Sequence, residues 1–184
     1  ELPKRPPQLC KGCPHIDSFN AINEALNDQS EKIVTADIGC YALGALPPYD
    51  SVETIVCMGA SVSLAKGAAE VGYKNVVAVI GDSTFLHSGL TPLVDAVASN
   101  SSITVIILDN ETVAMTGSQP TILPSSRLRK VVEGIGVDPD HIVEIRAEPK
   151  QREENIEAIR KEVAYEGLSV IISCRECLEA FRRR

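Results

Sequence analysis

Trp is absent from this sequence of 184 residues, and basic residues are outnumbered, with 18 Lys and Arg against 25 Asp and Glu. The resulting formal net charge of −7 argues against a nucleic-acid-binding surface. No apolar run approaches the roughly 20 residues that a membrane-spanning helix needs. The first nine residues, ELPKRPPQL, contain no apolar signal core, so nothing suggests secretion. These absences favour an intracellular, cytoplasmic protein that binds neither nucleic acid nor membrane.

An initiating Met is also missing, and residues 1–9 are rich in Pro, as in a linker. A chain of this length has the size of one ordinary domain and can bury a full core. We therefore expect a single domain over residues 1–184, with a linker-like segment over residues 1–9, excised from a longer subunit.

Two kinds of apolar segment alternate along the chain. Runs that are apolar on both faces indicate strands of a parallel sheet covered by helices, and segments with apolar residues at helical spacing lie between them. We expect strands over residues 32–36, 53–58, 75–81, 103–109, 141–145 and 168–173, and helices over residues 17–28, 61–72, 90–99 and 149–167. The polar segment 117–128 predicts a loop. The alternation predicts an α/β fold with an open, mainly parallel sheet flanked by helices.

Polar side chains follow two of the expected strands, at residues 81–84 and at Asp109 and Asn110. In open α/β sheets, ligands bind beyond the carboxyl ends of the strands. The Asp82 carboxylate, an amide oxygen and a turn carbonyl would form an all-oxygen set that suits Mg²⁺ or Ca²⁺, and Mg²⁺ usually shares its shell with phosphates. The alternative is that Asp82 and Asn110 are ordinary turn residues, and spacing alone does not decide between the two.

Six cysteines are a surplus for an intracellular domain, where paired spacings favour metal or cluster binding over disulfides. Two CxxC pairs, Cys10/Cys13 and Cys174/Cys177, could form a Cys₄ zinc site. Four thiolates also hold a [4Fe–4S] cluster, and residue types alone leave both open. Cys57, inside the expected strand over 53–58, is expected to be a free buried thiol.

Five motifs in order carry a resemblance to a known family: CKGCPH, ADIGCYALGALPP, CMGAS, GDSTFLHSGL and ILDNETVAMTGSQP. Together they resemble the α subunit of the indolepyruvate ferredoxin oxidoreductases, which belong to the 2-oxoacid:ferredoxin oxidoreductase family. The last two also resemble the general thiamine diphosphate motif, with Ser83 where Gly is usual. The resemblance covers nearly the whole chain but only the domain of that subunit that binds the diphosphate, and it implies the thiamine-diphosphate-binding fold.

The resemblance implies a role for individual residues. Mg²⁺ would be bound by Asp82, Asn110 and the Thr112 carbonyl. Thiamine diphosphate would be bound by Met58, Gly59, Ala60, Gly81, Asp82, Ser83, Thr84, Thr112, Met115 and Thr116. Residues 115–119 would form the active-site loop, and we expect His87 and Gln119 to be catalytic, with a helix-entry role as the alternative for His87.

The cluster ligands implied by the resemblance are Cys10, Cys13, Cys40 and Cys177. The family carries its fourth cysteine after the last strand, where this chain has SCREC, so Cys174 is the alternative to Cys177. His15 follows the CxxC pair directly. It could lie near the cluster or the active site, or make a structural hydrogen bond.

The implied reaction is the oxidative decarboxylation of an aryl 2-oxoacid such as indolepyruvate to the acyl-CoA, with coenzyme A as co-substrate and ferredoxin as electron acceptor. No motif supplies the Glu that contacts the aminopyrimidine. We therefore expect the chain to be inactive alone and to work in an oligomer with a pyrimidine-binding domain or subunit. Two alternatives stay open: a non-oxidative thiamine-dependent 2-oxoacid decarboxylase subunit, and a zinc-stabilised α/β module without chemistry.

Overall fold

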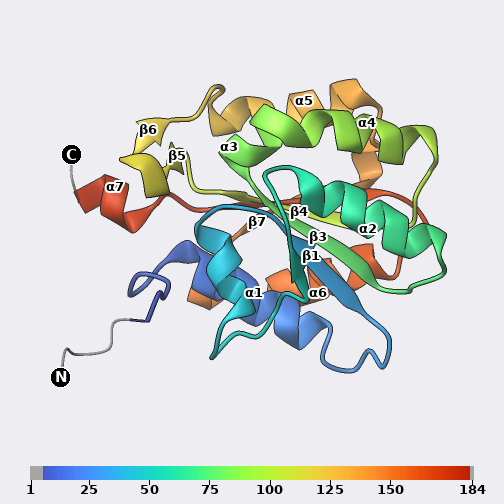
Figure 1. Ribbon diagram of the computed structural model, residues 1–184, viewed down its shortest axis with the longest axis horizontal. Helices are drawn as coiled ribbons and strands as arrows, with labels where there is room; N and C mark the ends of the chain where they lie inside the picture. Colours follow the sequence, from blue (N-terminus) through green and yellow to red (C-terminus); the bar gives the residue numbers. More distant parts are fainter. Residues whose placement is uncertain (1–5, 183–184) are drawn as a thin grey trace.

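A six-stranded parallel sheet forms the middle layer of the computed structural model, which describes residues 6–182 (Figure 1). The strand order is β2-β1-β3-β4-β8-β7. The six strands are β1 (Ile33–Ala36), β2 (Thr54–Ile55), β3 (Val76–Gly81), β4 (Thr104–Asp109), β7 (Ile142–Arg146) and β8 (Ser169–Cys174). The predicted α/β fold with an open parallel sheet is confirmed.

Helices cover both faces of this sheet (Figure 1). One face carries α2 (Ala60–Glu70), α4 (Leu90–Ala98) and α5 (Leu128–Ile135), and the other carries α1 (Pro14–Ala25) and α6 (Arg152–Val163). Local signals agree with these bounds. Pro14 occupies the first turn of α1, where its missing N–H has no cost, and Gly136 ends α5 in the left-handed conformation.

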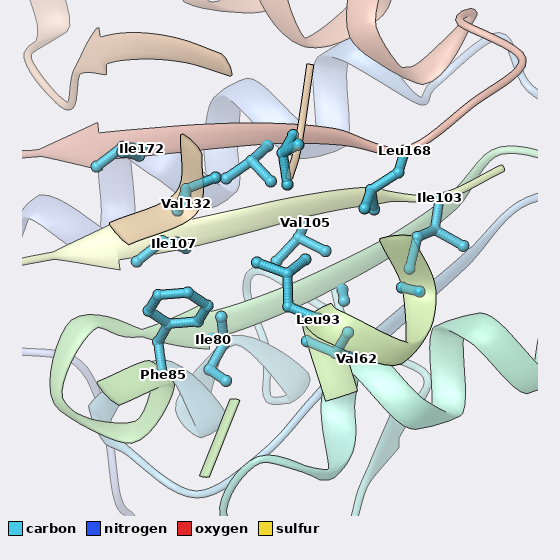
Figure 2. Close-up of a cluster of buried hydrophobic side chains, with 14 of the residues drawn as sticks. Val62, Ile80, Phe85, Leu93, Ile103, Val105, Ile107, Val132, Leu168 and Ile172 are labelled. Atoms are coloured by element: carbon cyan, nitrogen blue, oxygen red, sulfur yellow. The ribbon is translucent and has the colours of Figure 1, made fainter. Parts of the chain in front are cut away.

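The central strands are buried on both sides, which is why they read as continuous apolar runs. In β3, Ala78 and Ile80 pack into one core while Val77 and Val79 pack into the other. Figure 2 shows the first of these cores, where Leu93 of α4 lies over Ile80 and its neighbours in the sheet. Side chains of a strand alternate between faces, so each central strand contributes to two helical layers at once.

Two segments differ from the sequence-based expectation. The strand expected over 53–58 is only two residues long, because its partner β1 ends at Ala36 and leaves nothing for the later residues to pair with. Cys57 therefore leaves the sheet and is exposed, so the prediction of a buried thiol was wrong.

The polar segment 117–128 is not wholly a loop. Its β6 (Gln119–Pro120) pairs antiparallel with β5 (Thr112–Val113), enclosing a 3₁₀ turn, η3 (Ala114–Thr116). A second turn, η4 (Ser125–Arg127), leads into α5, which the sequence analysis did not predict. The remaining short elements include two helices, α3 (Asp82–Thr84) and α7 (Leu178–Arg182), and a π-helical turn, η2 (Phe85–Gly89). The remaining 3₁₀ turns are η1 (Cys40–Ala45), η5 (Pro139–His141) and η6 (Pro149–Gln151).

Residues 6–8 are exposed and have no regular secondary structure, whereas Leu9 is buried in the core beside α1. The first five residues of the expected linker lie outside the described residues. In the part of the chain that the structure describes, no helix combines the length and the apolar character that crossing a membrane requires.

The sheet order sets the place of a ligand site. The connection from β1 leads outward to β2, and the next strand, β3, returns to the other side of β1. The loops that follow β1 and β3 therefore diverge and leave a crevice at their carboxyl ends, the usual ligand position in such sheets.

Candidate functional site

A cavity of about 370 Å³ opens at the carboxyl ends of β1, β3 and β4, and we call it the strand-end cavity. It collects most of the residues predicted to bind the cofactor. The predicted residues that line it are Met58, Gly81, Asp82, Ser83, Thr84, Asn110, Thr112, Met115 and Thr116. Gly59 and Ala60 follow Met58 directly but are not lining residues.

Asp82 and the segment after β4 meet in this cavity, because Gly81 and Leu108 are paired in adjacent strands. The Asp82 carboxylate is 4% exposed; its Oδ1 accepts the Ser83 N–H at 2.6 Å and its Oδ2 accepts the Glu111 N–H at 2.9 Å. Burial and the neighbouring Asp109 carboxylate raise the pKa of Asp82 to about 7. A cation beside this carboxylate would favour its ionised form.

Asp109 is a second buried carboxylate at the same place, and no role was predicted for it from the sequence. Its Oδ1 accepts the Ser125 hydroxyl at 2.8 Å and the Glu111 N–H at 3.3 Å. In the described part of the chain, its Oδ2 is buried without a hydrogen-bond donor. Two buried carboxylates and the Asn110 amide make an oxygen-rich donor set that fits a hard divalent cation such as Mg²⁺.

Tyr41 forms a wall of the strand-end cavity and depends on glycines around it. A Cβ atom on Gly81 would lie 2.6 Å from the Tyr41 ring, and one on Gly39 would also clash with it. The Tyr41 hydroxyl donates a hydrogen bond to the Asp37 carboxylate. The ring is thus held in the space that side chains at 39 and 81 would need.

Asp37 joins the loop after β1 to the start of α2. Its side chain is fully buried and accepts the Gly59 N–H at 2.9 Å and the Ser61 hydroxyl at 2.8 Å. Burial raises the pKa of Asp37. Gly59 has φ of 84°, and a Cβ there would lie 2.5 Å from the Ser88 carbonyl oxygen in η2. Only glycine permits this close approach of the CMGAS segment to the turn after Asp82.

A second cavity, of about 350 Å³, collects the four predicted cluster ligands, and we call it the cysteine cavity. Cys10, Cys13, Cys40 and Cys177 all line it. The Cys13 N–H donates to the Cys10 carbonyl at 2.9 Å, and the Cys177 N–H donates to the Asn110 carbonyl at 3.1 Å. These main-chain bonds shape the CxxC turn and tie the segment after β8 to the end of β4.

Cys174 lies elsewhere. It packs against the core beneath α2, α4 and α5, whereas Cys13 packs against the core on the opposite face of the sheet. The structure therefore brings Cys177, and not Cys174, together with Cys10 and Cys13. Among residues 6–182, no three His, Cys, Asp or Glu side chains are arranged to hold a single metal ion.

Two thiols of the cysteine cavity, those of Cys13 and Cys40, are partly removed from water. Burial raises the pKa of Cys13 to about 11, against a smaller lowering by the His15 main-chain N–H, and burial also raises the pKa of Cys40. Thiols in such an environment are protonated at neutral pH, so a metal or cluster would displace their protons on binding.

The two cavities share a wall. The residues that line both are His15, Cys40, Asn110, Ala114 and Met115. The DN motif and the cysteine motifs, which are far apart in the sequence, therefore belong to one continuous region of the molecule.

The structure does not bring the two predicted catalytic residues to either cavity. His87 is exposed on η2, and Gln119 is exposed on β6, where its Nε2 donates to the Thr116 carbonyl at 2.8 Å. Neither lines the strand-end cavity or the cysteine cavity. Their catalytic role stays a prediction.

Comparison with known families matches residues 37–173 to the model of the thiamine pyrophosphate enzymes, C-terminal TPP binding domain. The chain belongs to this family. The match runs from Asp37 to Ser173, so it includes both strand-end motifs, Cys40 and every residue that lines the strand-end cavity except His15.

Among curated proteins, this thiamine pyrophosphate enzyme domain is similar to the indolepyruvate oxidoreductase subunit IorA of three organisms. It is 37% identical to that of Archaeoglobus fulgidus, over 96% of this chain and 29% of the relative. It is 35% identical to that of Methanothermobacter marburgensis, over 97% of this chain and 30% of the relative. The Pyrococcus horikoshii subunit is 37% identical over 96% and 30%. The chain thus spans about 30% of the length of these relatives.

Two solved structures share the fold at 16% sequence identity. One is a 2-oxoglutarate:ferredoxin oxidoreductase from Magnetococcus marinus, with a TM-score of 0.77 over 98% of this chain and 70% of that chain. The other is a thiamine diphosphate-dependent 4-hydroxybenzoylformate decarboxylase from Rhodococcus jostii, with a TM-score of 0.64 over 96% and 34%. At this identity the likeness shows the thiamine-diphosphate-binding fold alone.

Proposed function

We propose that this thiamine pyrophosphate enzyme domain binds the Mg²⁺-diphosphate end of the cofactor in a 2-oxoacid:ferredoxin oxidoreductase of the indolepyruvate type. The observation that carries the proposal is the shared wall of the two cavities, with Cys40 and Asn110 on both sides of it. A thiamine enzyme without redox chemistry has no need of four cysteines beside its diphosphate site.

The strand-end cavity supplies the diphosphate site. Asp82, Asn110 and the Thr112 carbonyl would bind Mg²⁺, and Asp109 would support them from behind through its bonds to Glu111 and Ser125. The other predicted cofactor residues, including Gly59 and Ala60, would contact the diphosphate and thiazolium. Bound thiamine diphosphate supplies the electron sink for decarboxylation, and the role of these residues is to hold and orient it.

The cysteine cavity supplies an electron acceptor. Cys10, Cys13, Cys40 and Cys177 would hold a [4Fe–4S] cluster. A Cys₄ zinc site of the two CxxC pairs needs Cys174 beside Cys13, and these two side chains pack on opposite faces of the sheet. The geometry therefore argues against a zinc site formed by the two CxxC pairs, and the similarity to indolepyruvate oxidoreductase subunits supports a cluster on the other four cysteines.

The reaction we propose is oxidative decarboxylation of an aryl 2-oxoacid. The acid and coenzyme A would give CO₂, an acyl-CoA, one proton and two electrons, and the electrons would pass through the cluster to ferredoxin. The names of the similar subunits support indolepyruvate as substrate. The Magnetococcus marinus enzyme, described with 2-oxoglutarate, coenzyme A and succinyl-CoA bound, supports the acyl-CoA product.

A pyrimidine-binding domain or subunit would complete the active site in a cytoplasmic oligomer. Apolar side chains are exposed around the mouth of the strand-end cavity: Ile38 is 44% exposed, Met58 42% and Met115 65%. Burying them under a partner that brings the catalytic Glu would exclude water from the cofactor. His87 and Gln119, both exposed, would reach the reacting atoms only from such an assembled interface.

The test is cofactor loading of the complete enzyme under anaerobic conditions. We expect Mg²⁺-dependent thiamine diphosphate binding by calorimetry, with iron and sulfide present in equal amounts. Asp82→Ala should weaken that binding at least a hundredfold, because it removes a charged ligand from a buried cation site. Zinc in place of iron, or thiamine diphosphate binding unchanged in Asp82→Ala, would refute the assignment.

A further inference from the structure

His15 is the one residue of the CKGCPH motif whose side chain lies between the two cavities. It sits in the first turn of α1, is 3% exposed and lines both the strand-end cavity and the cysteine cavity. Its ring stands edge-on to the Tyr41 ring, with centroids 6.2 Å apart. A buried polar ring in such a position needs hydrogen-bond partners.

The main chain of His15 contacts the cysteine cavity. Its N–H points to the Cys13 sulfur, where it lowers the pKa of the thiol against the larger effect of burial. An N–H in this position would also stabilise a thiolate that binds metal, because a negative sulfur attracts the donor more strongly than a neutral one.

The side chain of His15 contacts the strand-end cavity. Its Nε2 lies 3.4 Å from the Asn110 Nδ2. An amide nitrogen only donates, so Nε2 must accept, and the ring must be neutral with its proton on Nδ1.

The other end of the Asn110 amide is fixed as well. Its Oδ1 accepts the Thr112 N–H at 3.2 Å. Turning the amide over would place Nδ2 against that N–H, donor facing donor. The Thr112 N–H therefore sets the orientation of the amide, and the His15 Nε2 accepts from the amide nitrogen and holds it in that orientation, with a second lone pair left on the oxygen for a cation.

We propose that His15 is a positioning residue that holds the metal-binding amide of Asn110 in place from the cysteine side of the wall. The proposal rests on the function proposed above. A cation attracts the amide oxygen and repels the amide nitrogen, so the orientation of this one group decides whether Asn110 can bind Mg²⁺. His15, in the first turn of α1, thereby adds to the Mg²⁺ site one contact from outside the sheet.

The test compares His15→Leu, His15→Gln and Ser18→Ala in the complete enzyme. Leu fills space without accepting a hydrogen bond, while the Gln carbonyl can accept one from Asn110. Ser18 is also buried in α1 and bonds to Ser173 across the fold, but it lines neither cavity, so it controls for general disturbance of the helix.

We expect His15→Leu to weaken Mg²⁺-dependent thiamine diphosphate binding about tenfold, the usual effect of losing one buried hydrogen bond, with iron content retained. His15→Gln should restore affinity to within about threefold of wild type, and Ser18→Ala should leave it unchanged. With Mn²⁺ in place of Mg²⁺, the electron paramagnetic resonance spectrum should change in His15→Leu and return toward wild type in His15→Gln.

A double-mutant cycle measures the coupling between His15 and Asn110. Asn110→Asp has oxygen at both ends, so orientation no longer matters, and adding His15→Leu should then have little further effect. Equal weakening by His15→Leu in both backgrounds, an unchanged Mn²⁺ spectrum, or the same loss in Ser18→Ala would overturn the proposal. Absence of Mg²⁺-dependent binding in the wild-type enzyme would instead refute the function proposed above.

Discussion

The strand-end cavity and the cysteine cavity share a wall, yet they are built in different ways. Asp82 and Asn110 follow paired strands, and main-chain N–H groups already hold their side chains. None of the four cysteines in the cysteine cavity lies in a strand, and Cys10 is exposed in a segment without regular structure. The first site is organised by the sheet, whereas the second is organised in part by whatever its thiols bind.

The substitution with the largest expected effect disrupts the cysteine cavity and leaves the strand-end cavity intact. Cys177→Ser should remove all cluster iron, because three cysteines and a serine no longer supply the four thiolates. Thiamine diphosphate affinity should change less than about threefold, since the sheet holds Asp82 and Asn110 without the cluster. Iron and sulfide analysis beside calorimetry on the complete enzyme measures both. Retention of iron would show that Cys177 is not a ligand.

A pair of glycines compares the rigidity of the two sites. Gly59 and Gly12 both have positive φ, 84° and 78°, and each lies beside one cavity. Gly59→Ala should lower the free energy of unfolding by about 3 kcal/mol, because its Cβ meets the Ser88 carbonyl at 2.5 Å.

Gly12→Ala should cost only about 1 kcal/mol, since its Cβ meets the end of the Leu178 side chain at 3.1 Å, and that side chain can move. Urea unfolding of both variants measures the difference. Equal costs would mean that the two cavities are equally rigid.

Asp82→Asn separates binding from stability at the strand-end cavity. The pKa of Asp82 is raised from 3.8 to about 7, so its contribution to stability is full below pH 3.8 and is lost as pH rises through 7. In the presence of chelator, the free energy of unfolding of Asp82→Asn should exceed that of wild type by about 2 kcal/mol at pH 8. This difference should grow as pH rises from 4 and level off above pH 7.

The same variant should lose Mg²⁺-dependent binding of thiamine diphosphate, so the substitution raises stability and abolishes cofactor binding. Chemical unfolding across this pH range is the measurement. If the difference in unfolding free energy between Asp82→Asn and wild type does not vary with pH, burial does not raise the pKa of Asp82 in the absence of metal.

The smallest effect concerns Cys174. Its thiol donates to the Ile172 carbonyl at 3.7 Å and lies outside the cysteine cavity. Cys174→Ser should retain iron in full and lower the free energy of unfolding by only about 1 kcal/mol, the usual cost of a polar change at a partly buried position. Iron loss here would move the fourth ligand from Cys177 to Cys174.

Continuous apolar runs made the strands predictable, because parallel strands buried on both faces leave an unmistakable pattern. The exception, β2, is an edge strand whose length depends on where its partner β1 ends, and no local signal reports that. Helix α5 was missed because Pro124 and two serines precede it, and only Leu128 and Val132 on it are fully buried.

Asp82 and Asn110 were predictable because the ends of parallel strands converge on one edge. Asp37 was not predicted, and for His15 the sequence left a place near the cluster or active site and a structural hydrogen bond both open, because the roles of both residues come from partners far along the chain. Asp37 binds Gly59 and Ser61 at the start of α2, and the His15 ring meets Asn110 on another strand end. Such contacts depend on packing, and an acidic residue before Gly39 is the only local signal that pointed to Asp37.

The Tyr41 ring also has a consequence for how relatives of this domain evolve. It occupies the space of a side chain at both Gly39 and Gly81, so neither glycine can change while the ring stays. Substitution at 81 should be tolerated only after position 41 has become small, and the reverse order should be selected against. The three positions therefore form an epistatic unit, and an alignment of relatives should show them changing together or not at all.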